Sequence, residues 1–247
     1  MTLITRTVLG VVATTCLLAG SGAAMAEVVP ASPTPALELP TAPSLENGSW
    51  TARVLFATSA RNRPAAGTVV MRLKHYAPYT QGPNVFMVTG SKMINGRMWV
   101  RIQLPKRPNG SQGWVDESAL ELRRTRTWIR ITVSTRKVQV FNGGKRIKSF
   151  GAAVGTGGTP TPTGLFAIHD PVPTSAQLGP YIFVLTAHSN VLRTFAGGNG
   201  VVGIHGWPAS NVLGKAVSHG CVRMSREGAR ALARYAQPGT PVEIVNE

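Results

Sequence analysis

One cysteine and two histidines of this chain could together carry out covalent chemistry. Cys221 lies in the run Ser-His-Gly-Cys-Val-Arg-Met, residues 218–224, two positions after His219. His205 lies upstream in the run Gly-Ile-His-Gly, residues 203–206. A cysteine attacks a carbonyl carbon when a neighbouring base removes its proton or when its surroundings lower its pKa. The pattern therefore indicates acyl transfer by Cys221, with a histidine as the base.

Both histidines are candidates for that base. His205 follows an apolar run, residues 201–204, that predicts a strand, and catalytic groups often lie where a strand meets a loop. His219 would point to the same side of an extended segment as Cys221, but it has little freedom to reach the sulfur. We therefore favour His205 as the base and expect His219 to orient the loop or to line the acyl pocket.

The residues around Cys221 predict further activation of its thiol. Gly220 lets another backbone approach closely and frees amide N–H groups for an oxyanion hole. Ser225 is a suitable N-cap for a helix over residues 226–236, which Pro238-Gly239 ends. Because this helix begins soon after Cys221, we expect its positive end to lie near the sulfur.

The cysteine count supports a chemical role for Cys221. The first 26 residues predict a cleaved export signal, because Arg6 precedes a short apolar stretch and Ala24-Met25-Ala26 is typical of a cleavage site. An uncleaved anchor is the alternative. Cleavage removes Cys16, and a lone cysteine in an oxidising compartment forms no internal disulfide. We expect an exported protein without a stable membrane span and with a free Cys221 thiol.

Composition divides the rest of the chain into a linker and two β-rich parts. The 247 residues include 27 glycines and 18 prolines but only 6% aromatics, which suits short strands joined by tight turns. Frequent prolines over residues 27–48 predict an extended linker. A first module then covers residues 49–123, a basic run marks the joint at 123–126, and a second domain covers residues 127–247.

Apolar runs and turn residues predict the strands of both parts. Alternation along residues 99–104 predicts a strand, and Pro-Asn-Gly at 108–110 predicts a turn before a strand at 113–115. Asn-Gly-Gly at 142–144 predicts a hairpin turn. Strands of the second domain are expected at 129–133, 138–140, 145–154, 165–168, 181–185, 201–204 and 242–245.

The charge of the chain is strongly basic. It has 26 Lys and Arg against 10 Asp and Glu, a net charge of +16, which attracts polyanions over a long range. We expect no nucleic-acid partner, because no helix-turn-helix, zinc-finger or RRM signature is present and the basic residues are spread along the chain. An exported protein would meet acidic wall polymers instead.

The motifs resemble one enzyme family. The runs at 203–206 and 218–223, together with Val-Gly at 154–155 and Pro-Thr-Pro-Thr-Gly at 160–164, are similar to the L,D-transpeptidase catalytic domain, also called the YkuD domain. The resemblance covers residues 127–245. It implies a mainly β, sandwich-like fold with one main helix after the cysteine.

The resemblance also implies a reaction. Cys221 would attack the carbonyl of the third residue of a peptidoglycan tetrapeptide stem, expel the terminal D-Ala and form a thioester. His205 would take the thiol proton, and backbone N–H groups from His219 through Gly220 to Cys221 would hold the oxyanion. An amine from a neighbouring stem would complete a 3→3 cross-link. We expect no cofactor and no metal, a monomer, and sensitivity to carbapenems.

Substrate contacts follow from the same resemblance. Tyr181 and His188 precede the site, with Ser189 beside them, and Ser218 and Arg223 flank the cysteine. For Tyr181, filling the strand's core is an equal alternative. The sequence departs from the common pattern in two ways, since only twelve residues, 206–217, separate His205 from Ser218 and an arginine stands at 223 where asparagine is frequent. Both variants occur in the family.

The first module resembles a bacterial SH3-like domain in its last two expected strands, 99–104 and 113–115. Such a module in front of the catalytic domain is familiar in actinobacterial wall enzymes. Trp99 or Trp114 could contact wall peptides, although covering a small barrel core is the favoured role.

Three other functions were weighed against this one. A zinc site could use His188, His205, His219 and Cys221, but no paired spacing such as Cys-x-x-Cys is present. Papain-type and NlpC-type peptidases place their histidine after the cysteine, and no histidine follows Cys221. A wall-binding protein without enzymatic activity would not need Cys221 at all.

Overall fold

The computed structural model describes residues 39–175 and 178–247. The expected export signal with Cys16, and the expected linker up to residue 38, lie outside the described residues. Glu38–Glu247 form one compact unit. The described part is mainly β, and none of its helices is long and apolar enough to cross a membrane.

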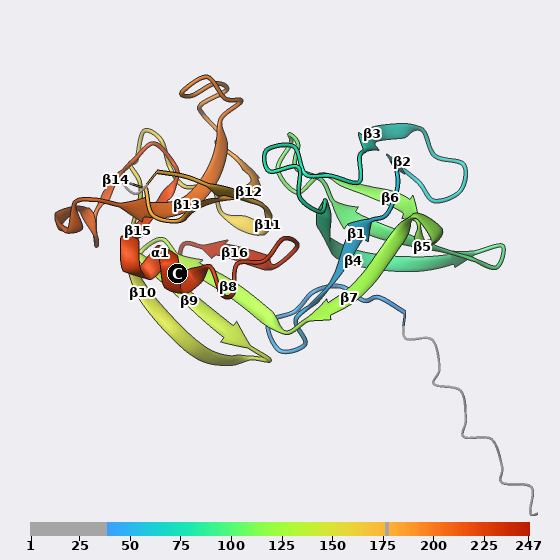
Figure 1. The fold of residues 1–247 in the computed structure, drawn as a ribbon, viewed down its shortest axis with the longest axis horizontal. Coiled ribbons are helices and arrows are strands. Elements are labelled where there is room, and N and C mark those ends of the chain that lie inside the picture. The colour runs from blue at the N-terminus through green and yellow to red at the C-terminus, as the bar shows by residue number, and fades with distance from the viewer. Residues whose placement is uncertain (1–38, 176–177) are drawn as a thin grey trace, which may run out of the picture. The chain divides into compact units, whose positions relative to one another are not determined.

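The first sheet contains seven strands in the order β3-β2-β6-β5-β4-β1-β7 (Figure 1). The expected strand at 99–104 is confirmed as β5, and the expected strand at 113–115 as β6. The assignment of this sheet as SH3-like stays a prediction. The strands are β1 (Ser49–Val54), β2 (Thr58–Arg61), β3 (Val69–Leu73), β4 (Val85–Ile94), β5 (Arg97–Gln103), β6 (Gln112–Asp116) and β7 (Leu120–Thr125), with a 3-10 helix at Glu117–Ala119.

The core of the first sheet follows the alternation seen in the sequence. Val100 and Ile102 are fully buried in its apolar cluster. On the opposite face of β5, Trp99 is buried. The guanidinium of Arg101 lies over the ring of Trp114 on the neighbouring strand, 5.4 Å from the ring centroid. The apolar cluster of this sheet includes neither Trp99 nor Trp114, so a cover over a barrel core stays a prediction for both residues.

The second sheet contains nine strands in the order β14-β10-β15-β13-β12-β11-β16-β8-β9. A strand is present at each of the seven positions expected from the sequence. The elements are β8 (Thr127–Thr132), β9 (Lys137–Asn142), β10 (Lys145–Gly155), β11 (Gly164–Pro173), β12 (Tyr181–His188), β13 (Val201–Trp207), a 3-10 helix (Ser210–Val212), β14 (Ala216–Ser218), β15 (Val222–Ser225), α1 (Arg226–Leu232) and β16 (Pro241–Val245).

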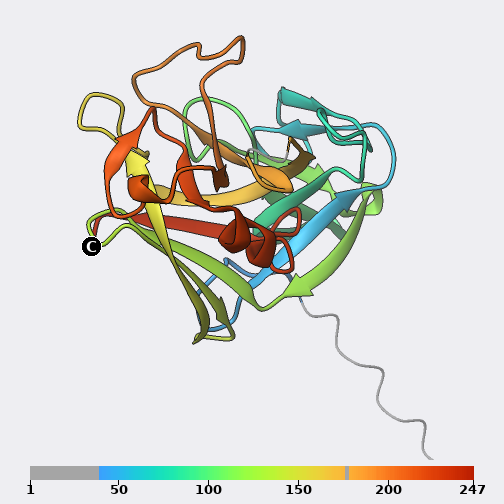
Figure 2. The same cartoon turned by 60° about the vertical axis from the view of Figure 1, so that its left-hand side comes forward.

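The long strand β10 closes the second sheet on itself (Figure 2). Its first part pairs with β9, after the expected hairpin turn at Gly143 and Gly144, whose φ angles of 55° and 77° favour glycine. Its last residues pair with β15 and β14. The pairings therefore form a closed ring of strands, and the sandwich arrangement stays a prediction.

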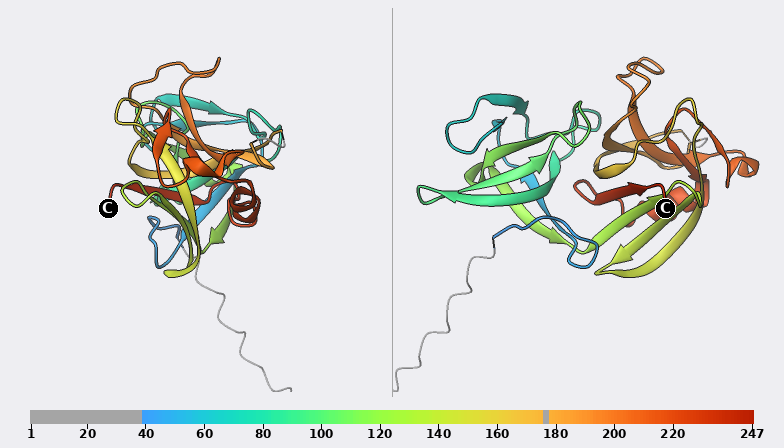
Figure 3. Two further views of the ribbon diagram at one scale, coloured as in Figure 1. Left: turned by 90° about the vertical axis from the view of Figure 1, so that its left-hand side faces the viewer. Right: turned by 180° about the vertical axis from the view of Figure 1, so that it is seen from behind.

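The helix α1 packs against β13 and β15 (Figure 3). The Ser225 hydroxyl accepts a hydrogen bond from Gly228 N at 2.9 Å, which confirms the expected N-cap. Leu232 is buried in the core of the second sheet. The helix ends at Leu232, four residues before the expected end, because the last turn tightens when Tyr235 N donates to Leu232 O.

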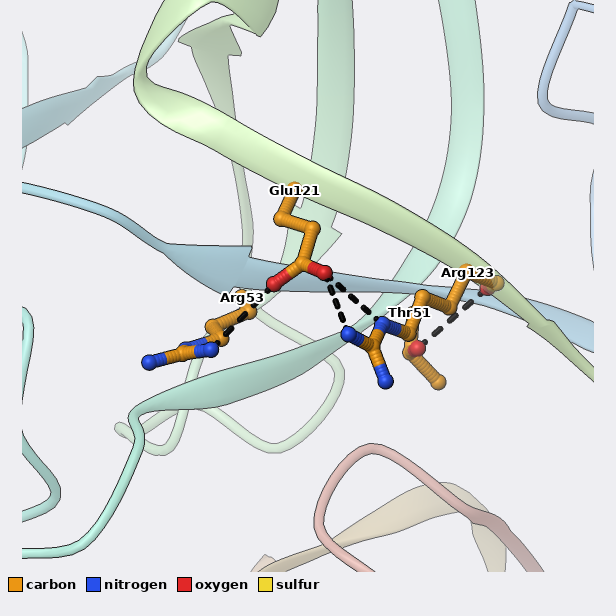
Figure 4. Close-up of polar contacts among 4 residues, drawn as sticks. All are labelled: Thr51, Arg53, Glu121 and Arg123. Carbon is orange, nitrogen blue, oxygen red and sulfur yellow. Dashed lines mark hydrogen bonds and ion pairs between the residues drawn. The ribbon is translucent and has the colours of Figure 1, made fainter. Parts of the chain in front are cut away.

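Only one residue separates the two sheets in sequence. β7 ends at Thr125 and β8 begins at Thr127, so the basic joint at 123–126 is mostly strand. β7 pairs with β1, and Glu121 on β7 forms an ion pair with Arg53 on β1 at 3.3 Å (Figure 4). Glu121 also forms an ion pair with Arg123 on its own strand. Exposed ion pairs of this kind contribute only about 0–1 kcal/mol each, so the strand pairing itself dominates.

Buried polar groups join the two sheets. Gln103 at the end of β5 donates to Leu165 O at 2.6 Å and accepts from the Thr186 hydroxyl at 2.7 Å. Asp170 on β11 accepts from Thr80 through both its backbone N–H and its hydroxyl. Buried polar groups are costly when unpaired, so these bonds fix the contact between the sheets.

His169 lies at an irregular point of β11, where the pairing with β12 shifts between Ile168 and Asp170. Its side chain is only 5% exposed, and its ring centroid lies 5.8 Å from that of Phe86 on the first sheet. Burial lowers the pKa of His169 from 6.5 to about 4, partly offset by the charge of Asp170.

His169 makes folding stability depend on pH. Because its folded pKa is depressed, the unfolded chain takes up the proton first as the pH falls below 6.5. The unfolding free energy should therefore fall by roughly 3 kcal/mol from this residue between pH 6.5 and 4. Urea unfolding of wild type and His169→Leu across this range measures it, with His75→Leu at an exposed position as the control. An equally steep fall in His169→Leu would contradict the assignment.

Candidate active site

The parallel pairing of β13 with β15 brings the predicted nucleophile and base to one face of the sheet. In the register, His205 lies opposite Arg223, and Ile204 opposite Val222. Side chains alternate along strands, and Ile204 and Val222 point into the core. His205 and Arg223 therefore share the other face. Cys221, one residue before β15, is two positions from Arg223 and lies on that face as well.

The thiol of Cys221 is free and partly buried. Burial raises its pKa above the ordinary value of 9.0, while a hydrogen bond from the backbone of Gly203 and the charge of Arg223 act in the opposite direction. The thiol is therefore protonated at neutral pH. It needs a base before it can attack a carbonyl carbon.

His205 has the protonation state of such a base. Its side chain is 8% exposed, and Nδ1 lies 2.8 Å from the carbonyl oxygen of Gly206. A carbonyl only accepts hydrogen bonds, so Nδ1 carries the proton and Nε2 keeps its lone pair in the neutral ring. Burial lowers the pKa of His205 below 6.5, the bond to Gly206 opposes this, and the charge of Arg223 adds to it. The ring is neutral at pH 7.

The helix expected to activate Cys221 does not reach it. The four residues of β15 lie between Cys221 and α1, and four strand residues span about 13 Å. The expectation of a helix end beside the sulfur is therefore wrong. The positive charge near the sulfur belongs to Arg223, whose guanidinium carbon lies 3.7 Å from the centroid of the Trp207 ring.

The loop between β10 and β11 holds the segment that carries Cys221. The hydroxyl of Thr161 donates to Gly220 O at 2.9 Å and accepts from Gly155 N at 2.9 Å. The hydroxyl of Thr159 donates to Ser218 O at 3.0 Å. A Cβ at position 155 would lie 2.2 Å from Thr159 O, so the loop can close in this way only around glycine.

Ser218 and Gly220 shape the turn before the nucleophile. The buried Ser218 hydroxyl donates to Cys221 O and accepts from Gly220 N at 3.1 Å. Gly220 has a φ of +119°, a conformation that favours glycine. Because the Gly220 amide is already bonded, an oxyanion hole at this turn would use other N–H groups, such as that of Cys221.

The two candidate bases have different surroundings. His219 is exposed, and its ring stacks on Phe195, with centroids 4.9 Å apart and planes at 29°. Phe195 belongs to the loop between β12 and β13. His205 is buried beside Arg223 and its Nδ1 is already oriented. This geometry supports His205 over His219 as the base, a choice that stays a proposal.

Two residues of the expected substrate set make contacts that do not include Cys221, and their role in binding stays a prediction. Tyr181 packs against the core, with its ring 5.8 Å from that of Phe183. The ring of His188 borders a small cavity that is also lined by His169 and Asn199 and not by Cys221. Burial and the charge of Arg107 lower the pKa of His188. Ser218 and Arg223, by contrast, lie at the nucleophile.

The potential zinc ligands are not gathered at one point. Among residues 39–175 and 178–247, no group of three or more His, Cys, Asp or Glu side chains could hold a metal ion. His188 and His219 in particular have separate surroundings, the first in the cavity and the second in the stack with Phe195.

Sequence reasoning did not identify three residues that shape the site. Thr159 and Thr161 support the turn at Gly220, and Trp207 supports Arg223. Trp207 could have been found, because it lies two positions after His205 on the same strand and so on the same face. Thr161 lies in the run 160–164 that carries the family resemblance, but the contacts of both threonines join segments 59 residues apart, and no local pattern predicts them.

Comparison with known proteins identifies relatives of the part of the chain that forms the second sheet. A family model described as the L,D-transpeptidase catalytic domain, YkuD, matches residues 126–244. The YkuD protein of Bacillus licheniformis is 30% identical over 117 residues, which are 47% of this chain and 64% of that protein. The chain thus spans somewhat less than two thirds of the length of this relative.

Solved structures are also similar. The catalytic domain of the Enterococcus faecium L,D-transpeptidase is 21% identical, covers 48% of this chain and 96% of its own, and has a TM-score of 0.37. L,D-transpeptidase 3 of Mycobacterium tuberculosis, in complex with a faropenem-derived adduct, is 15% identical, covers 60% and 90%, and has a TM-score of 0.42.

Arg223 should control the reactivity of the Cys221 thiol. In Arg223→Gln the thiol loses a favourable charge, its pKa rises further, and alkylation by iodoacetamide at pH 7.5 should slow severalfold. Peptide mass spectrometry at a series of pH values measures the rate. Arg230→Gln, on the exposed face of α1, is the matched control. Identical pH profiles for wild type and Arg223→Gln would contradict this role.

Thr161 should hold the turn at Gly220 through its hydroxyl. Thr161→Val keeps the shape but leaves Gly155 N and Gly220 O unpaired, so the unfolding free energy should fall by about 1–3 kcal/mol. Thr161→Ser keeps both bonds and should stay close to wild type. Urea unfolding of the two variants is the measurement, and equal stabilities would show that the hydroxyl does not support the turn.

Proposed function

We propose, from the match of residues 126–244 to the L,D-transpeptidase catalytic domain model, that this protein is a member of that family and forms 3→3 cross-links between peptidoglycan stem peptides. The observation that carries the proposal is the arrangement of Cys221, His205 and Arg223 on one face of β13 and β15, inside the matched segment. A cysteine on the same sheet face as a neutral, oriented histidine fits acyl transfer through a thioester.

The first half of the proposed reaction acylates Cys221. His205 Nε2 takes the thiol proton while the sulfur attacks the carbonyl carbon of the third stem residue. The bond from this carbon to the nitrogen of the terminal D-Ala then breaks. The imidazolium returns the proton to the departing amine, and D-Ala leaves as a neutral amine. The stem remains bound to Cys221 as a thioester.

The second half transfers the stem. A side-chain amine of a neighbouring stem attacks the thioester carbon and gives up a proton to His205. The carbon–sulfur bond breaks, the sulfur is protonated again, and the new amide is the cross-link. During both halves the positive charge of Arg223 stabilises negative charge on the sulfur, since it favours the thiolate form of Cys221.

The wider setting of the reaction is part of the proposal. We propose that the chain is exported to the cell wall as a monomer and that its basic surface favours acidic wall polymers. The first module, residues 49–123, is proposed to be SH3-like, as in actinobacterial wall enzymes. Carbapenems should acylate Cys221, as the resemblance to the L,D-transpeptidase family implies.

Intact-mass spectrometry after incubation with a tetrapeptide stem tests the proposal. Wild type should gain the mass of the stem less D-Ala, and Cys221→Ala should gain nothing. His205→Asn should slow acylation by about 10²–10⁴-fold because the base is lost, whereas His219→Asn should change it much less.

The products decide between cross-linking and its alternatives. With a donor and an acceptor stem, wild type should yield the 3→3 dimer. If the only products are stems that have lost their terminal D-Ala, the enzyme hydrolyses the thioester and the transpeptidase assignment is wrong. A wild-type protein that binds wall fragments but never gains acyl mass would support a binding protein instead.

A further inference from the structure

We infer that Arg107 and Asn109, on the loop between β5 and β6, position the acyl pocket of the catalytic domain from outside it. Residues 104–111 are called the latch loop here. Residues 189–200, between β12 and β13 and drawn in orange in Figure 1, are called the pocket loop. The inference rests on the proposed function, because it assigns positioning residues to the same site.

Arg107 binds three carbonyl oxygens of the pocket loop. Nη1 donates to Asn199 O at 2.7 Å, and Nη2 donates to Ser189 O at 3.1 Å and to Leu192 O at 2.9 Å. The guanidinium thus ties together both ends of the loop and its first turn. A planar fork of donors can do this, whereas an ammonium group places its donors around a single point.

Asn109 fixes the start of the pocket loop. Its amide oxygen accepts from His188 N at 2.8 Å, and its amide nitrogen donates to His188 O at 2.8 Å. The nitrogen also lies 3.2 Å from Asn190 Oδ1. The side chain therefore pairs with the end of β12 as a neighbouring strand would.

The pocket loop leaves room for this contact. A Cβ at position 200 would lie 2.1 Å from Leu192 O and 2.9 Å from Nη2 of Arg107, so glycine is required there. Gly200 also has a φ of +74°, which favours glycine. The loop backbone and the arginine therefore fit each other closely.

Within itself the pocket loop has few fixed points. Ser189 N donates to Gly200 O at its base, and Phe195 and Gly198 exchange two backbone bonds at its tip. Phe195 remains 46% exposed. Without its carbonyl contacts to Arg107, the segment between base and tip would depend on these bonds and on two bonds to the Ser189 hydroxyl. The side-chain contacts of Asn190 with Asn109 and of Asn199 with His188 would also remain.

The tip of the pocket loop touches the catalytic turn. Phe195 stacks on His219, which is two residues before Cys221. A continuous series of contacts therefore runs from Arg107 through the pocket loop to the turn that carries the nucleophile. The position of Phe195 and His219, and with it one wall of the acyl pocket, depends on a residue of the first sheet.

Other bonds between the sheets provide an internal control. Gln103 joins the sheets at Leu165 and Thr186, on β11 and β12, and does not contact the pocket loop. If the first sheet acted only as a general support, losing Gln103 and losing Arg107 would have similar effects on catalysis.

The test compares carbapenem acylation rates by intact mass in the full chain. Arg107→Ala should acylate about tenfold more slowly, because three charge-assisted bonds are lost, and Arg107→Lys should not restore the rate. Gln103→Leu should stay within about twofold of wild type even if it lowers the melting temperature. Arg97→Ala, at an exposed arginine of β5, is the matched control.

A double-mutant cycle with Phe195→Ala separates positioning from general destabilisation. If Arg107 acts through the pocket loop, Arg107→Ala should have little further effect once Phe195 is removed. A wild-type rate in Arg107→Ala, or a full additional loss in the double variant, would overturn the inference alone. A wild-type protein that takes up no carbapenem would overturn the proposed function instead, and with it the positioning role of Arg107.

Discussion

The parallel pairing of β13 with β15 is the constraint on which the site depends. Its register sets His205 opposite Arg223 and leaves Cys221 on the same face. The apolar residues between them, Ile204 and Val222, are buried in the core. A slip of one residue would expose this core and turn the thiol inward, so the packing of the sheet and the geometry of the site are specified together.

Much of the second sheet could be predicted because its signals are local. Alternation, glycine turns and the N-cap at Ser225 depend on residues close in sequence, and the run around Cys221 marks the candidate nucleophile. The short strand β15 was missed, so the helix was placed too near the sulfur. Contacts such as Thr161 with Gly220, or Arg107 with the pocket loop, link distant segments whose register no local pattern reveals.

The first sheet and the catalytic turn are connected by hydrogen bonds of different kinds. Gln103 and Asp170 are buried and join strand to strand or strand to loop. Arg107 instead binds backbone carbonyls of a loop that has few internal hydrogen bonds, and Asn109 binds the last residue of the strand before that loop. The first kind stabilises the fold, and the second selects one conformation of a loop, so variants at the two places should affect different properties of the protein.

The buried, protonated state of Cys221 has a consequence for its survival as a nucleophile. Peroxide and disulfide exchange both consume the thiolate rather than the thiol. A thiol whose pKa is raised by burial has a small thiolate fraction, so both reactions are slow in oxidising surroundings. Under the proposed mechanism, the cysteine is thus protected while it is idle, and it becomes reactive only when His205 takes its proton against a bound carbonyl.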